Sequence, residues 1–162
     1  MPDVLILMGS DSDAPVMQAA VDTLKEFGIS SEMTVASAHR SPARVMRLVD
    51  EAPGRGVKIF IVGAGAAAHL GGVVAAHTTL PVIGVPIDSS ALKGMDALLA
   101  TVQMPPGVPV ATMAIGKPGA TNAAVFAAQI LGVADQVMAQ KLVDYKKRLA
   151  DKVEAAAARL RG

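Results

Sequence analysis

Aliphatic runs of strand length recur along the chain and are separated by longer, more polar segments. Most of these runs are rich in Val, Ile and Leu without polar alternation, which is typical of strands buried on both faces of a sheet. The predicted strands cover residues 3–9, 31–37, 57–65, 80–86 and 108–116. Because the intervening segments have the length of helices, the pattern predicts a parallel sheet with helices on both faces.

The segments between the strands carry helical spacing and helix-boundary residues. In the first of them Val16, Ala20 and Leu24 fall on one face, and Gly28 is a natural stop. Ser41 and the following proline combine a cap residue with a favoured first helical residue. The predicted helices cover residues 13–27, 42–52, an Ala-rich segment up to 78, 91–102, and one or two helices within 119–160.

We therefore expect one α/β domain over residues 1–162, with a flavodoxin- or Rossmann-like parallel sheet and a C-terminal helical extension. We find no internal repeat, low-complexity tract or linker. The segment "TNAAVFAAQILGV" (residues 121–133) is apolar almost all round. Such a helix is buried on several sides, and in a domain of this size we expect other subunits to contribute to that burial.

Composition narrows the function classes. The chain is 52% hydrophobic but only 2% aromatic, so its core consists of small and aliphatic side chains. A net charge of +1 argues against partners such as nucleic acid or an anionic membrane. Without cysteine there is no disulfide or thiolate metal site. The N-terminal run does not resemble a signal peptide and no apolar segment has membrane-spanning length, so we expect a cytoplasmic protein.

The candidate site follows from the sheet. Parallel α/β sheets bind ligands beyond the carboxyl ends of their strands, near the point where the strand order reverses. In the commonest five-stranded order the first and third strands are neighbours at that point. The loops to consider therefore follow the first three strands and read "GSDSD" (9–13), "SAHR" (37–40) and "GAGAAAH" (63–69).

The first loop has the polar groups of an anion or sugar site. Ser10 and Ser12 carry hydroxyls, and the helix that follows offers free backbone N–H groups. These groups suit a phosphate or ribose hydroxyls, and Asp13 can accept a hydrogen bond from a ribose hydroxyl. The alternative is that Ser12 or Asp13 only caps the helix.

The second loop places an imidazole beside a guanidinium. Arg40 is permanently charged and can bind a phosphate through two N–H groups. His39 is the kind of side chain that both gives and takes a proton near neutral pH. The alternative is a solvated arginine and a histidine that is hydrogen-bonded within the loop. Ser41 is expected only to cap the next helix.

The third loop formally matches the dinucleotide-binding pattern G-x-G-x-x-G/A through Gly63, Gly65 and Ala68. We discount the match because that pattern belongs after the first strand of its unit, and because no residues remain for a substrate domain. Glycines here still let a ligand approach the backbone. His69 is expected in the first turn of the helix that follows, and His77 is expected to be structural.

Several other site types lack their residues. Three scattered histidines without H-E-x-x-H give no metal-ligand spacing, so we expect no metal. There is no G-x-S-x-G elbow of the hydrolases and no Walker loop. The third strand ends in Gly-Ala-Gly, where a receiver domain would need an aspartate.

Taken together, six ordered segments resemble one known family: "MGSDSD", "SAHRSP", "GAGAAAHL", "PVIGVP", "QMPPGVPVAT" and "NAAVFAAQIL". They are similar, in order and spacing, to the class I N5-carboxyaminoimidazole ribonucleotide mutases of purine biosynthesis, also called the catalytic subunit of phosphoribosylaminoimidazole carboxylase. The resemblance covers essentially the whole chain. It implies a three-layer αβα fold, a homo-octamer, and conversion of N5-carboxyaminoimidazole ribonucleotide to 4-carboxy-5-aminoimidazole ribonucleotide without a cofactor, with CO2 as intermediate.

The resemblance also assigns residues. It implies that His39 is the general acid and base, and that the segment from Gly65 to Leu70 holds the carboxylate or CO2. The implied substrate-binding residues are Ser10, Ser12, Asp13, Ser37, Ala38, Arg40, Gly65, Ala66, His69 and Leu70.

Two residues depart from the family's usual "GAGGAAHLPG": Ala66 replaces a glycine and Gly71 replaces a proline. We expect Ala66 to require a negative φ and Gly71 to loosen the first turn of its helix, which alters loop geometry and rate more than the reaction. The class that uses CO2 directly has a different loop here, which favours the mutase. Direct carboxylation, a non-catalytic nucleotide-binding module and a dinucleotide-dependent enzyme stay open as alternatives.

Overall fold

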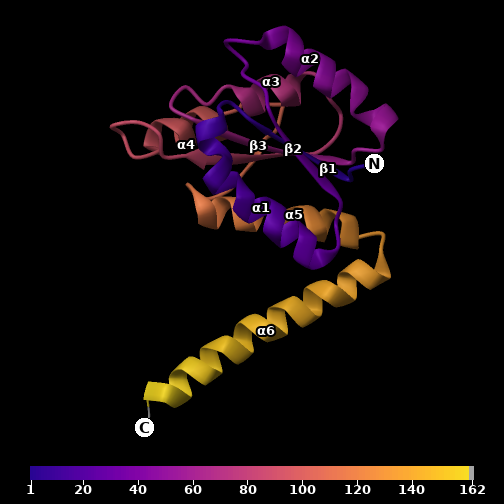
Figure 1. Cartoon of the computed structure of the whole chain (residues 1–162), viewed down its shortest axis with the longest axis vertical. Helices are drawn as coiled ribbons and strands as arrows, with labels where there is room; N and C mark the ends of the chain where they lie inside the picture. Colours follow the sequence, from indigo (N-terminus) through magenta and orange to yellow (C-terminus); the bar gives the residue numbers. More distant parts are fainter. Residues whose placement is uncertain (161–162) are drawn as a thin grey trace. The chain divides into compact units, whose positions relative to one another are not determined.

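A computed structural model describes residues 1–160. The strands and helices alternate over the first two thirds of the chain, and the last third is helical (Figure 1). In chain order the elements are β1 (Val4–Met8), η1 (Asp11–Asp13), α1 (Ala14–Phe27), β2 (Ser31–Val35), α2 (Pro42–Glu51), η2 (Pro53–Arg55), β3 (Ile59–Gly65), α3 (Leu70–Ala76), β4 (Val82–Ile87), α4 (Met95–Val102), β5 (Ala111–Thr112), α5 (Lys117–Gly132) and α6 (Gln136–Leu160).

The five strands form one parallel sheet in the order β2-β1-β3-β4-β5. This is the doubly wound order in which β1 and β3 are neighbours and the chain turns back between them. Met8 pairs with Val35 on one side and with Gly63 on the other, so three strand ends meet at one edge. The predicted sheet is confirmed, and so is the expected place for a ligand.

Helices cover both faces of this sheet. On one face, side chains of α2, α3 and α4 form a core with alternate residues of the strands, such as Leu5, Leu7 and Phe60. On the other face α1 packs closely enough that a Cβ on Gly63 would overlap Met17 (Figure 1). The first part of α5 contributes to the second helical layer. The three layers are those expected of an αβα fold.

The two edge strands differ from the central ones. The residues of β1 are all buried, whereas those of β2 are partly exposed. The predicted fifth strand of nine residues is reduced to the two residues of β5, which pair only with β4. Pro109 just before it has no N–H for a sheet ladder, and a strand at an edge gains bonds on one side only. The prediction of its length was therefore wrong.

Contacts divide the chain into two compact units, Met1–Ala127 and Ala128–Gly162, and α5 runs from the first into the second. In α5 the buried side chains belong to alanines at helical spacing: Ala120, Ala123, Ala124, Ala127 and Ala128. Its bulkier side chains are partly exposed, so the single chain buries one stripe of this helix and not its whole circumference.

In the second unit, Asp135 precedes α6, and its carboxylate accepts hydrogen bonds from the backbone N–H groups of Val137 and Met138 at 2.9 and 3.1 Å. Most of its side chains are exposed, although Met138 is buried. Over residues 1–160, the chain contains no helix with the length and hydropathy needed to cross a membrane.

Candidate functional site

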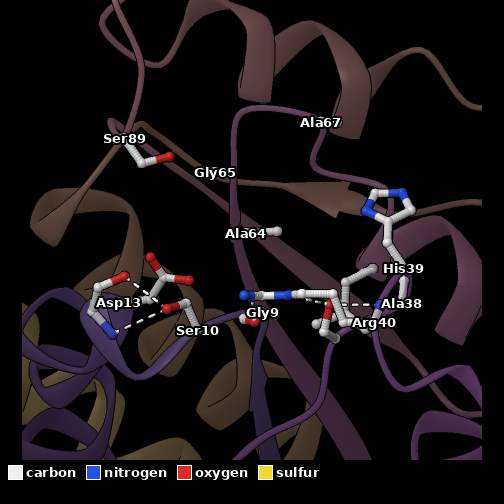
Figure 2. A pocket seen from close by; sticks show the side chains of 13 residues that line it. Gly9, Ser10, Asp13, Ala38, His39, Arg40, Ala64, Gly65, Ala67 and Ser89 are labelled. Atoms are coloured by element: carbon white, nitrogen blue, oxygen red, sulfur yellow. Dashed lines mark hydrogen bonds between the residues drawn. The ribbon is translucent and has the colours of Figure 1, made fainter.

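A pocket of about 180 Å³ lies at the carboxyl ends of the central strands (Figure 2). Residues that follow β1, β2, β3 and β4 contribute to it. The lining residues are Gly9, Ser10, Ser12, Asp13, Ser37, Ala38, His39, Arg40, Ala64, Gly65, Ala67, Leu70 and Ser89. The pocket thus brings together all the predicted site residues except Ala66 and His69.

The first loop forms a short 3-10 turn that Ser10 caps. The Ser10 hydroxyl accepts hydrogen bonds from the Ser12 backbone N–H at 3.3 Å and the Ser12 hydroxyl at 2.9 Å, and it donates to Asp11 at 3.2 Å. Asp13 holds the N-cap position of α1, but its side chain makes no capping bond, so the alternative that Ser12 or Asp13 only caps the helix is wrong. The Ser10 hydroxyl organises the loop, and the Ser12 oxygen keeps free lone pairs at the pocket.

Asp13 is the buried acid of the site. Its residue is 6% exposed, and in the described chain its carboxylate caps none of the N–H groups of α1. Burial raises the pKa of the Asp13 carboxyl, opposed by the backbone of Ser10 and the charge of Arg40. Figure 2 shows the carboxylate directed into the pocket. A buried carboxylate that does not cap a helix is suited to accept hydrogen bonds from hydroxyl groups of a ligand.

The second loop is closed by two serines. The Ser41 hydroxyl accepts a hydrogen bond from the Ser37 N–H at 3.1 Å and donates to the Ser37 carbonyl at 3.2 Å. The Ser37 hydroxyl in turn accepts from the Arg40 N–H at 3.2 Å. Within the described residues Ser41 makes no side-chain bond to the first N–H groups of α2, so the expectation that it only caps this helix was wrong. It fixes the loop that carries His39.

Arg40 connects the second loop to the first. One of its terminal nitrogens donates to the Gly9 carbonyl at 2.9 Å, and its Nε donates to the Ser37 hydroxyl at 3.4 Å. Figure 2 shows its side chain extended across the pocket between His39 and Asp13. Because these bonds use only part of a five-donor group, the guanidinium keeps donors for an anion.

His39 contacts a second histidine. Its Nε2 lies 2.8 Å from Nδ1 of His69, and the two rings meet edge to face at 81°. His69 is the N-cap residue just before the first residue of α3, and not a residue of the helix's first turn as expected. His69 thus contacts His39 but is not among the lining residues.

The glycines of the third loop belong to β3. A Cβ on Gly63 would overlap Met17 of α1, and a Cβ on Gly65 would overlap the Ser89 hydroxyl. Close packing therefore explains both glycines without a dinucleotide. This supports the decision to discount the G-x-G-x-x-A match.

Ala66 has a φ of +48°, in the left-handed region. The expectation that an alanine at this position requires a negative φ was wrong. The residue follows β3 directly, and its carbonyl accepts a hydrogen bond from the Ala68 N–H at 2.8 Å, which closes a tight turn. A glycine would adopt this conformation with less strain, so the chain retains the loop geometry at a conformational cost.

Three lining residues lie outside the predicted site residues and segment: Gly9, Ala64 and Ser89. A fourth, Ala67, lies within the segment from Gly65 to Leu70 that the resemblance implies for CO2. Ser89 contributes a hydroxyl next to Gly65, on the side of the pocket opposite Arg40 in Figure 2. It follows β4, and the sequence reasoning considered only the first three strand ends. The general rule for parallel sheets would have included this fourth loop.

The arrangement suits a small polar ligand with an anionic group. It offers a guanidinium, a buried carboxylate, hydroxyls and an imidazole from separate strand ends, next to small apolar residues such as Ala38, Ala64 and Ala67. An imidazole at the margin can move a proton, and the small side chains leave room for a small apolar molecule. These groups are suited to proton transfer on a bound phosphorylated metabolite.

Comparison with known proteins gives consistent matches. A family model described as AIR carboxylase matches residues 3–152. N5-carboxyaminoimidazole ribonucleotide mutase of Thermotoga maritima is 52% identical over 160 residues, which covers 99% of this chain and 92% of the relative. The mutase of Bacillus subtilis is 55% identical over 141 residues, 87% of each chain.

Among solved structures, Treponema denticola PurE superimposes with a TM-score of 0.89 at 29% sequence identity, over 98% of both chains. This similarity agrees with the sheet order and layers described above. Since the family model matches nearly the whole chain and relatives share half of its residues, the chain belongs to the AIR carboxylase family.

Proposed function

We propose that the chain interconverts N5-carboxyaminoimidazole ribonucleotide and 4-carboxy-5-aminoimidazole ribonucleotide in purine biosynthesis. The observation that carries this proposal is the near-full-length identity of 52–55% with proteins named N5-carboxyaminoimidazole ribonucleotide mutase. The enzyme is then an isomerase that moves a carboxyl group within one molecule.

Substrate binding is assigned to the first two loops. Arg40 binds the phosphate, since its guanidinium is fixed at one end by Gly9 and keeps further donors. Asp13 accepts hydrogen bonds from the ribose hydroxyls. It does not bind the phosphate, because a buried carboxylate and a phosphate would repel each other. Ser12 and the backbone of the 9–13 loop complete the polar contacts.

The reaction needs one proton to move between two atoms of the substrate. His39 donates a proton to the exocyclic nitrogen as its bond to the carboxylate carbon breaks, and CO2 and the aminoimidazole result. C4 of the ring then attacks CO2 to form the new carbon–carbon bond, and His39 takes the proton that C4 releases. The proton lost by His39 in the first step is thus returned in the second, and no cofactor is required.

CO2 has to stay close to C4 between the two steps. The small residues at the end of β3 and just after it, Gly65 and Ala67, form the least polar part of the pocket lining together with Ala38 and Leu70. We assign them to hold CO2 away from water while the ring attacks it.

The test compares two substrates with the same enzyme. We expect rapid formation of 4-carboxy-5-aminoimidazole ribonucleotide from the N5-carboxy compound in buffer free of bicarbonate. Aminoimidazole ribonucleotide with bicarbonate should react much more slowly. Binding of the nucleotide without turnover of either substrate would contradict the enzyme assignment.

Direct carboxylation of aminoimidazole ribonucleotide is the second candidate, because the matching family model is described as AIR carboxylase. The same comparison separates the two reactions. Faster turnover of aminoimidazole ribonucleotide with CO2 than of the N5-carboxy compound would favour the carboxylase.

We also propose a cytoplasmic homo-octamer. An exposed apolar stripe on and before α4 supports assembly: Leu92, Met95, Leu99 and Val102 are 64, 52, 50 and 47% exposed. Within α4, the spacing of four and three residues places Met95, Leu99 and Val102 on one side of the helix. Such a stripe is typical of a surface that contacts another protein chain.

A further inference from the structure

The contact between His39 and His69 determines which nitrogen of His39 is available to a ligand. The 2.8 Å contact involves Nε2 of His39 and Nδ1 of His69. His39 lines the pocket, whereas His69 lies outside its lining. With Nε2 engaged by His69, Nδ1 is the nitrogen that remains for proton exchange with a substrate.

His69 is held in place by its backbone. Its N–H donates to the Ala67 carbonyl at 2.8 Å, and its carbonyl accepts from the Val73 N–H at 3.0 Å in the first turn of α3. The next residue, Leu70, is buried in the core. A side chain with such a support can fix the orientation of a neighbouring imidazole.

Only one hydrogen fits between the two nitrogens, so the pair has two neutral arrangements. In the first, His39 carries its hydrogen on Nε2 and donates it to His69, which leaves a lone pair on Nδ1 for the base step. In the second, His69 donates to His39, whose Nδ1 then carries the hydrogen and cannot act as a base.

The first arrangement alone serves both halves of the proposed reaction. In the first step the imidazolium form of His39 gives the proton on Nδ1 to the exocyclic nitrogen and keeps its Nε2–H bonded to His69. In the second step Nδ1 of the neutral ring takes the proton from C4, and the same bond to His69 remains. His69 therefore keeps one hydrogen bond unchanged while the proton moves on the other side of the ring.

We infer that His69 is a positioning residue that fixes His39 with its hydrogen on Nε2 and presents Nδ1 to the substrate. The inference rests on the proposed function and adds to it the reacting atom. It also gives His69 a role different from the substrate contact that the sequence resemblance implied.

The test uses His69→Phe, which keeps the ring shape but removes the acceptor, and His69→Asn, whose side-chain oxygen takes the place of Nδ1. We expect His69→Phe to lower kcat by about 10–100-fold, as loss of an orienting partner does, with KM within about twofold of the wild type. His69→Asn should recover most of kcat. His77→Phe is the matched control, because His77 lies at the other end of α3 and, among the described residues, its ring bonds only to the Val73 carbonyl.

A second readout does not depend on turnover. In ¹⁵N NMR spectra of the wild type at alkaline pH, His39 should show a protonated Nε2 and an unprotonated Nδ1, and His69→Phe should lose this preference. Unchanged kcat in His69→Phe, or a protonated Nδ1 in the wild type, would overturn the inference. An inactive wild type with the expected tautomer would instead contradict the proposed function and leave the inference standing.

Discussion

The His39 side chain is the group on which the proposed reaction depends most directly. Replacement by asparagine retains a polar side chain on a loop closed by Ser37 and Ser41, so the nucleotide site should keep its shape. We expect His39→Asn to lower turnover on the order of 10²–10⁴-fold, because proton transfer is lost. Nucleotide affinity, measured by calorimetry, should stay close to that of the wild type. Substantial remaining turnover would mean that another group carries the proton.

The ionised Asp13 side chain should lower the free energy of unfolding, because it is buried in the pocket. Burial raises its pKa above the ordinary value of 3.8 in the folded chain. The folded state therefore holds its proton more tightly than the unfolded state, and stability falls as pH rises from the ordinary pKa through the raised one. An asparagine avoids this loss.

We therefore expect Asp13→Asn to have a higher Tm than the wild type at neutral pH, with the difference vanishing below the ordinary pKa. Thermal unfolding of the ligand-free protein over a pH series provides the measurement. Asp11→Asn in the same turn is the control, since Asp11 is exposed and should give a smaller change. An equal gain in both variants would show that net charge, and not burial, is responsible.

Ala66 stores conformational strain next to the pocket. With φ at +48°, a glycine should relieve more strain than it adds in chain entropy. We expect Ala66→Gly to gain about 1 kcal/mol, which corresponds to about 2–4 °C in Tm for a chain of this size. In the neighbouring control Ala67→Gly, where φ is not positive, stability should fall. A lower Tm in Ala66→Gly would contradict the strain argument.

Single residues were predicted where a loop position determines their surroundings. Residues such as Ser10, Asp13 and Arg40 follow strand ends, and strand ends can be read from the pattern. The pairing of His39 with His69 and the positive φ of Ala66 depend on how two loops meet in space. No local pattern contains that information.

The first turn of α3 contains two glycines, Gly71 and Gly72. A Cβ on Gly71 would lie 3.6 Å from Val110, an ordinary contact, whereas on Gly72 it would lie 3.2 Å from Met104. We expect Gly71→Ala to gain about 0.4–1 kcal/mol from lower entropy of the unfolded chain.

Gly72→Ala serves as the comparison, because Met104 has to shift and part of the gain is lost. Chemical unfolding at a fixed protein concentration measures both variants. A loss of stability in Gly71→Ala would show that the helix start needs the freedom of glycine.

Strands were predicted well where both of their faces are buried in the sheet. The central strands β1, β3 and β4 are buried along nearly their whole length, and continuous apolar runs reveal them. The edge strand β5 was predicted too long, because apolar content does not indicate where ladder partners end. The short helix η1 was not predicted either. The sequence analysis sought the cap at Ser12 or Asp13, whereas Ser10 caps η1, which precedes α1.

At the level of the whole molecule, the exposed apolar stripe of α4 predicts that the chain assembles into an oligomer. We expect the wild type to sediment as an oligomer and Leu99→Asp to shift it to smaller species, because a charge would enter the exposed apolar stripe. Gln103→Asp, just after α4, is the matched control and should leave the oligomer intact. A wild type that sediments as a stable monomer would contradict both the stripe and the octamer.

The sheet order was predictable because few topologies satisfy a repeated strand–helix pattern of this length. The division into the units Met1–Ala127 and Ala128–Gly162 was not. The boundary falls inside α5, where helical periodicity continues without a break. A pattern that marks helices does not mark which neighbours those helices contact.

The bond from Arg40 to the Gly9 carbonyl has a consequence for redesign of the pocket. A library that exchanges Arg40 to accept an uncharged ligand would also leave the end of β1 without its partner. Variants changed at Arg40 alone would then lose activity because the Gly9 carbonyl lacks its hydrogen-bond donor. Because the acceptor is a backbone carbonyl, a successful library would introduce a neighbouring donor at the same time, or would begin at Ser89, on the other side of the pocket.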